Sequence, residues 1–137
     1  MPPRIYPTVA ETIEAHRLLI EEFGGLHGIR DKGLLESAVL RPQNGHYGNL
    51  IEQASALMES LANNHAFLDG NKRISFVMTD AMLPANGYFL DVEPFEGHKS
   101  IIEAMEKNGF RFPMILDWIT SIVKPLPAEE NRKQKRK

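Results

Sequence analysis

The 137-residue sequence contains no cysteine, and this absence excludes disulfide bonds and thiolate metal sites. It also lacks any apolar run that approaches the roughly 20 residues needed for a membrane-spanning helix. Residues 1–7 carry three prolines and no hydrophobic segment of the kind found in signal peptides. We therefore expect a cytoplasmic protein without a membrane partner.

A large excess of charge of either sign is also absent, because the net charge is −2. Residues 128–137 carry +3, which leaves −5 on the rest of the chain. An acidic body is not typical of nucleic-acid-binding proteins, so nucleic acid is not expected as a partner. The end of the chain has no apolar residue after Ala128 and follows Pro125 and Pro127. We expect residues 125–137 to form a disordered basic tail.

In the rest of the sequence, apolar residues recur with the spacing of helices, and no strand-like alternation of useful length is present. Hydrophobic residues make up 42% of the chain and charged residues 25%, which is ordinary for one globular domain. After a lead-in over residues 1–7, residues 8–124 are expected to form one all-α domain, a compact bundle of about six helices. The expected helices span about 8–23, 32–40, 50–63, 71–83, 94–107 and 113–124.

Several helix starts have recognisable signals. Thr8 and Glu11 have the spacing of a capping box, and Asp31 and Asn49 stand where side chains cap the second and third helices. His16 lies on the apolar stripe of the first helix, so we interpret it as a hydrogen-bonded core histidine rather than a ligand. Arg30, next to the capping Asp31, is interpreted as a charge that braces its loop.

The fourth and fifth helices carry two more expectations. Pro84 cannot donate a helical hydrogen bond, so the fourth helix either stops at about Leu83 or kinks and resumes to Asn86, with Gly87 as its left-handed cap. The fifth helix begins with a proline and is expected to bury one apolar face, made of Phe95, Ile101, Ile102 and Met105.

Chemically active side chains gather in nine residues between the third and fourth helices, His65-Ala66-Phe67-Leu68-Asp69-Gly70-Asn71-Lys72-Arg73. The first N–H groups of a helix lack internal partners and carry the positive end of its dipole, so phosphate binds there readily. Gly70 lets the backbone turn and approach a ligand closely. Lys72 and Arg73 add full positive charges. This pattern favours an anionic ligand.

The remaining members of the stretch indicate what else the site needs. Asp69 repels phosphate unless a divalent cation lies between them, and Mg²⁺ is typically held by one or two carboxylates plus substrate phosphates. An imidazole titrates near neutral pH, which makes His65 the natural general base. Phe67 offers no chemistry and is expected to anchor the loop by burying its ring. The stretch thus predicts a Mg-nucleotide site with a base beside it.

The pattern His-x-Phe-x-Asp-Gly-Asn-Lys-Arg resembles the signature of the Fic/Doc superfamily, in its death-on-curing (Doc) branch. Further likeness runs from Thr8 to Val123 and includes residues 16–25, 28–31, 34–38, 41–42 and 86–88. The resemblance implies the Fic/Doc helical fold, with residues 42–49 as a flap that aligns the target protein. It also implies a role for each motif position: His65 takes the proton from a target hydroxyl, Asp69 binds Mg²⁺, and Asn71 positions phosphate or base-side oxygens. Gly70, Lys72 and Arg73 hold the phosphates of ATP.

Two reactions remain open on this resemblance. Family enzymes that transfer AMP usually have glycine where this chain has Lys72. In the Doc branch, that lysine accompanies a reversed nucleotide and phosphorylation of a translation elongation factor. We favour the toxin of a toxin–antitoxin pair that transfers the γ-phosphate of ATP to a target-protein hydroxyl, with AMP transfer as the alternative.

A third possibility is a catalytically inactive protein that only binds an antitoxin. Every polar catalytic position of the motif is filled, which disfavours it. The family's self-inhibitory motif is not matched within the chain, because Ser60 follows Glu59 where that motif needs glycine or asparagine. Control is therefore expected from a separate antitoxin protein.

Overall fold

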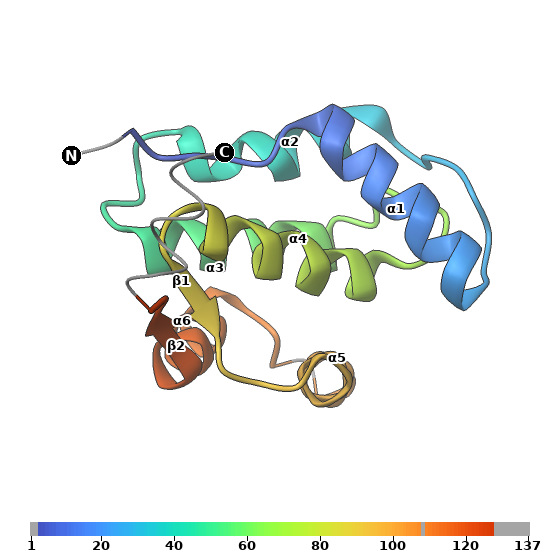
Figure 1. Ribbon diagram of the computed structural model, residues 1–137. Coiled ribbons are helices and arrows are strands. Elements are labelled where there is room, and N and C mark those ends of the chain that lie inside the picture. The colour runs from blue at the N-terminus through green and yellow to red at the C-terminus, as the bar shows by residue number, and fades with distance from the viewer. Residues whose placement is uncertain (1–2, 108, 128–137) are drawn as a thin grey trace.

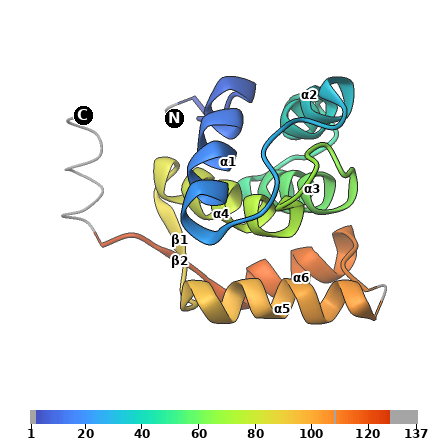
Figure 2. The same cartoon turned by 90° about the vertical axis from the view of Figure 1, so that its right-hand side faces the viewer.

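The structure, a computed structural model, describes residues 3–107 and 109–127, and its helices are stacked in three layers (Figures 1 and 2). The central layer holds two neighbouring helices, α3 (Leu50–Asn63) and α4 (Asn71–Ala85). One outer layer holds α1 (Val9–Phe23) and α2 (Lys32–Leu40), and the other holds α5 (Pro94–Glu106) and α6 (Phe112–Ile122). The expected all-α bundle of six helices is confirmed. No helix in the described part of the chain is long and apolar enough to cross a membrane.

The predicted helix starts are confirmed by their hydrogen bonds. The Thr8 hydroxyl accepts from the Glu11 N–H at 3.1 Å, and the Glu11 carboxylate accepts from the Thr8 N–H at 2.9 Å, which completes the capping box. Asp31 and Asn49 accept in the same way from the N–H groups of Leu34 and Glu52, at the starts of α2 and α3. Local sequence therefore fixes where these helices begin.

Pro84 does not end α4, which continues to Ala85. Proline removes the N–H bond to the Asp80 carbonyl, but only Ala85 follows it in the helix, so little of α4 depends on that bond. The N–H groups of Asn86 and Gly87 donate back to carbonyls of this turn, and Gly87 takes a left-handed φ of 90°. Of the two alternatives, the structure has the helix that passes the proline and closes at Gly87.

A small sheet corrects the expected end of the sixth helix. Residues Val123–Pro125 form strand β2, which pairs antiparallel with β1 (Tyr88–Leu90) instead of continuing α6. The Leu126 N–H then donates to the Gly87 carbonyl at 2.9 Å. Regular structure therefore continues past the boundary expected after residue 124. The sequence does not reveal this strand, because three residues are too few to show an alternating pattern. Residues 128–137, where most of the basic tail was expected, lie outside the described residues.

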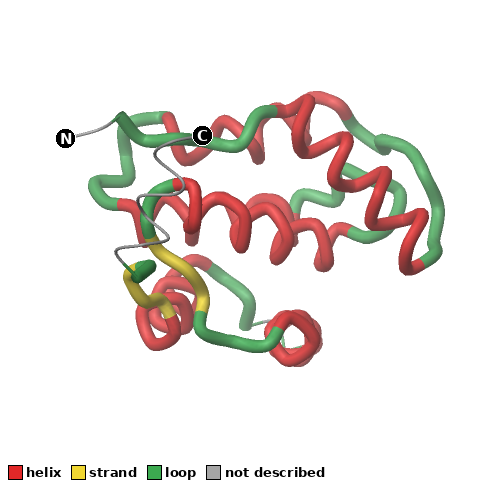
Figure 3. Tube along the Cα trace, in the orientation of Figure 1, coloured by secondary structure: helices red, strands yellow, loops and turns green. Residues whose placement is uncertain are grey.

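The expected flap, residues 42–49, is not at the motif. It contains the end of a short 3₁₀ turn, Arg41–Gln43, and precedes the start of α3, whereas His65 follows the end of α3. A 14-residue helix is about 21 Å long, so the two loops lie at opposite ends of the bundle (Figure 3). Tyr47 in this loop packs against Phe112 instead. The expectation is wrong because α3 separates the two segments.

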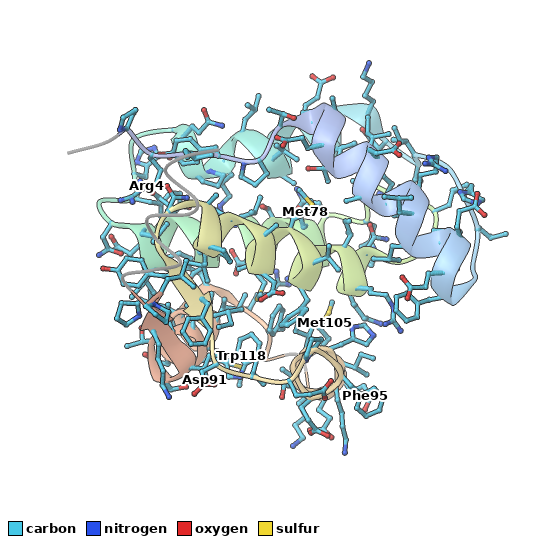
Figure 4. All side chains as sticks on the ribbon, viewed as in Figure 1. Arg4, Met78, Asp91, Phe95, Met105 and Trp118 are labelled. Carbon is cyan, nitrogen blue, oxygen red and sulfur yellow. The ribbon has the colours of Figure 1, made fainter. Side chains whose placement is uncertain are left out.

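Phe95 was expected on the buried face of α5, and this expectation is also wrong. Phe95 is 68% exposed, whereas Ile101 is fully buried. In Figure 4, Phe95 points away from α4, while Met105 points toward it. Phe95 and Ile101 are six residues apart, roughly 120° around a helix, so they stand at opposite edges of the expected stripe. The edge that carries Phe95 is the exposed one.

Gly97 places α5 close to α4. A Cβ added at Gly97 would lie 2.5 Å from the Phe76 ring, which is itself only 4% exposed and cannot move aside. We expect Gly97→Ala to lower the free energy of unfolding by about 1–3 kcal/mol, because the buried contact is overpacked.

Gly33→Ala is the matched control: that helical glycine is exposed and has room for a Cβ, so stability should stay unchanged or rise by up to about 1 kcal/mol. Urea unfolding measures both. Equal effects of the two substitutions would contradict the packing role of Gly97.

Candidate active site

Two loops that are distant in sequence meet at one end of the bundle, residues 24–31 between α1 and α2 and residues 64–70 between α3 and α4 (Figure 3). The N–H of Arg30 donates to the Ala66 carbonyl at 2.8 Å, and an isolated antiparallel bridge joins the neighbouring residues. The first loop therefore supports the motif loop along its backbone.

The side chain of Arg30 extends this support to His65. Its Nε donates to the His65 carbonyl at 2.5 Å, and its Nη2 donates to the Asn64 carbonyl at 3.3 Å. The predicted bracing role of Arg30 is confirmed. His65 has a φ of 53°, a left-handed conformation that is uncommon for a residue with a Cβ. The bonds from Arg30 hold this turn, and the His65 side chain remains exposed at the surface.

His16 fastens the motif loop from inside the protein. Its side chain is 3% exposed, its Nε2 lies 2.7 Å from the Asp69 carbonyl oxygen, and its ring stacks on Phe67 with centroids 3.8 Å apart. The expected core histidine is confirmed. Burial lowers the pKa of His16, although the bond to the carbonyl opposes that shift. The ring is therefore neutral near pH 7, with its proton on Nε2 as the donor.

Asn71 closes the motif loop on itself. Its Oδ1 accepts from the Phe67 N–H at 3.0 Å, and its Nδ2 donates to the Phe67 carbonyl at 3.0 Å. Phe67 is 2% exposed, which is the burial that a loop anchor requires. The amide of Asn71 is thus engaged with the loop backbone, and its implied contact with phosphate or base-side oxygens stays a prediction. Its contribution in this structure is to hold the loop shape.

The Asp69 carboxylate lies against the first loop. One oxygen accepts from the Leu26 N–H at 3.1 Å, and the other accepts from the Gly70 N–H at 2.9 Å. A Cβ at Gly25 would lie 2.6 Å from the first of these oxygens, so only glycine allows this approach. Each oxygen has a second lone-pair direction, which leaves the carboxylate able to bind a further group.

The start of α4 is open toward an anion. Gly70 stands at its N-cap with φ 77°, and no side chain within the described residues caps this helix. Side chains do cap α1, α2, α3 and α5. Lys72 is exposed in the first turn, and the Arg73 guanidinium lies 4.2 Å from the centre of the Phe23 ring. The helix dipole and two side-chain cations thus act in one place.

A cavity of about 420 Å³ lies over this helix start. Its described walls come from α1, α3, α4, α5 and the loops between them. The predicted residues among these walls are His65, Asp69, Gly70, Asn71, Lys72 and Arg73. Sequence reasoning missed the contributions of α1 and α5, which are Leu19, Phe23, His98 and Ile102. A signal for His98 existed, because it precedes Ile101 and Ile102 by three and four residues and so shares their helix face.

The charges in the cavity limit which metal it could hold. Within the described residues, no group of three or more histidine, aspartate or glutamate side chains could hold a metal ion by itself. Asp69 supplies the one carboxylate found among the described cavity walls. Mg²⁺ bound with substrate phosphates needs only one or two carboxylates, so these residues fit that mode of binding and no all-protein metal cage.

Comparison with known proteins adds two findings. Residues 6–83 match the family described as Fic/DOC family. Over 70 residues the chain is also 47% identical to a protein named Toxin Doc from Mycolicibacterium smegmatis, a match that covers 47% of this chain. The chain spans about half the length of that curated relative, 54%. The matched family segment includes the whole cavity wall that α1, the motif loop and the start of α4 contribute.

We expect Gly25→Ala to destabilise the protein more than Gly24→Ala. Both glycines have positive φ, so alanine at either position strains the backbone by about 1–3 kcal/mol. Only at Gly25 does the new Cβ also meet the Asp69 carboxylate, whereas nothing lies within 4 Å at Gly24. The added loss at Gly25 should be about 1–3 kcal/mol. Thermal unfolding of the two variants measures it, and equal melting temperatures would contradict the contact.

Proposed function

The chain belongs to the Fic/DOC family, and from this premise we propose that it is the toxin of a toxin–antitoxin pair that transfers the γ-phosphate of ATP to a hydroxyl of a target protein. Fic/DOC proteins are typically enzymes that transfer nucleotide-derived groups to proteins. The name of the Mycolicibacterium relative supports the toxin role and a separate antitoxin as partner. A translation factor is the proposed target.

The observation that carries the proposal is the uncapped start of α4 facing the cavity. Its free N–H groups, Lys72 and Arg73 together offer hydrogen-bond donors and charge to a polyphosphate. Phosphoryl transfer needs little covalent help from a protein, since positioning and charge neutralisation supply most of the acceleration. A cavity of this charge and size supports a nucleotide as the ligand.

His65 is proposed as the general base. It lines the cavity, its side chain is exposed to an incoming protein, and Arg30 fixes its backbone. The imidazole takes the proton of the target hydroxyl as the hydroxyl oxygen forms its bond to the γ-phosphorus. The bond from that phosphorus to the β–γ bridging oxygen breaks at the same time, and ADP leaves with that electron pair.

Asp69 would hold Mg²⁺, together with phosphate oxygens of ATP. When bound, the ion neutralises charge that develops on the phosphates. The Leu26 and Gly70 N–H groups fix the orientation of the carboxylate, so that its position does not depend on side-chain freedom. The bond of His16 to the Asp69 carbonyl anchors the same residue through its backbone.

Lys72 determines which phosphate lies near His65 in this proposal. A lysine stem crowds the space beside the helix start that a glycine would leave open for the α- and β-phosphates. Its ammonium group instead favours a terminal phosphate, which carries the most charge. The γ-phosphorus is then the reacting atom rather than the α-phosphorus.

Labelled ATP distinguishes the two reactions. The protein is incubated with bacterial lysate and either γ-labelled or α-labelled ATP, and label on protein is measured. We expect label from the γ-position only, with His65→Ala reducing it at least about a hundredfold because the base is lost. Lys72→Gly should also lower transfer from the γ-position sharply. Label from the α-position would replace phosphorylation with AMP transfer, and no label from either would favour an inactive antitoxin-binding protein.

Asp69→Asn tests the metal-ligand role. We expect it to weaken ATP binding in Mg²⁺ much more than ATP binding in EDTA, because an amide is a poor Mg²⁺ ligand. The substitution also removes one of the carboxylate's two backbone contacts, so thermal unfolding without ATP is measured as the control for a loss of fold. If binding falls equally in Mg²⁺ and in EDTA, Asp69 does not bind the metal.

A further inference from the structure

His98 adds a basic side chain to the cavity from outside the motif. It lies on α5, next to Gly97, whose close contact with Phe76 fixes α5 against α4. We propose that His98 is a phosphate-binding residue, whose imidazole donates to the anionic group that Lys72 and Arg73 hold. This inference rests on the proposed function, because it assumes that the cavity receives the phosphates of a nucleotide.

The hydrogen bonding of His98 is incomplete in the protein alone. Its Nδ1 is buried without a hydrogen-bond partner, and the ring has none among the described residues. A buried N–H without an acceptor is unfavourable, which favours the neutral tautomer that carries its proton on Nε2. Of the two ring nitrogens, Nε2 is the one available to a ligand, because Nδ1 is covered by protein and the residue lines the cavity. A bound phosphate oxygen would give this N–H the acceptor that the protein does not supply.

The charges around His98 make its protonation depend on the ligand. Burial lowers the pKa of His98, and the cations Arg73 and Lys72 lower it further. The other titratable groups in the described cavity walls are His65 and Asp69, while α1 contributes only apolar side chains there. A bound polyphosphate adds negative charge beside the ring and reverses the effect of the two cations.

The phosphate's effect on the pKa of His98 sets the direction in which ATP affinity changes with pH. With phosphate bound, the pKa of His98 is higher than in the free protein, so binding takes up a proton. Affinity therefore rises as the pH falls through the interval between the free and bound pKa values, and is constant outside it. A neutral ring still donates one hydrogen bond from Nε2, and the imidazolium adds charge to that bond.

Calorimetric titration of the full chain with ATP and Mg²⁺, at about pH 8 and about pH 6, tests the inference. His98→Gln retains a donor but cannot take up a proton, whereas His98→Phe keeps a ring without a donor. We expect the parent to gain about three- to tenfold more affinity than His98→Gln between the two pH values. His98→Phe should bind about tenfold more weakly than the parent at pH 6. The γ-phosphate titrates in the same range, but its effect is common to all variants.

Another histidine provides the control. His46→Gln changes an exposed residue in the 42–49 loop and should leave the gain unchanged. If His98→Gln keeps the full gain, the role of His98 is rejected. If the parent binds no ATP at either pH, the proposed function itself fails, which separates the two outcomes.

Discussion

The candidate site depends on the buried imidazole of His16. Its Nε2 donates to the carbonyl of Asp69, and its ring lies flat on Phe67, so that one side chain of α1 holds two residues of the motif loop. A buried polar group needs a partner, and here the partner is the backbone of the loop itself. With Phe67 held inside, His65 and Asp69 remain on the outer side of the loop. The reactive side chains are thus positioned by two residues that have no role in the chemistry.

Close approach of separate segments is the second constraint, and three glycines permit it. Gly25 lets the first loop reach the Asp69 carboxylate, and Gly97 lets α5 reach Phe76. Gly70 takes a left-handed φ and leaves room for Ile20, whose Cδ1 would lie 3.2 Å from an added Cβ. At each position a larger residue would move one wall of the cavity. The site is therefore sensitive to backbone changes well away from the motif.

Local charge rather than net charge decides what the cavity can hold. The chain carries −2 overall, yet the uncapped start of α4, Lys72 and Arg73 gather positive potential in one wall of the cavity. The Phe23 ring against Arg73 holds one of these cations in place without neutralising it. An acidic surface with one basic cavity suits a small polyanion better than an extended one.

The sequence by itself determined the features that depend on neighbours along the chain. The helix starts at Thr8, Asp31 and Asn49 each depend on one capping side chain and the next few N–H groups. The motif is recognised from nine consecutive residues alone. The burial of His16 followed from its place in a helical repeat. Each of these needs only the fixed geometry of a helix or turn, which is the same in any protein.

Only the tertiary structure decided which surfaces meet. It placed residues 24–31 rather than 42–49 beside the motif, paired β1 with β2, exposed Phe95 and brought His98 into the cavity at the start of α4. It also turned the amide of Asn71 onto the backbone of its own loop. These outcomes depend on helix packing, where the position of one glycine or one ring selects among arrangements that share the same sequence periodicity.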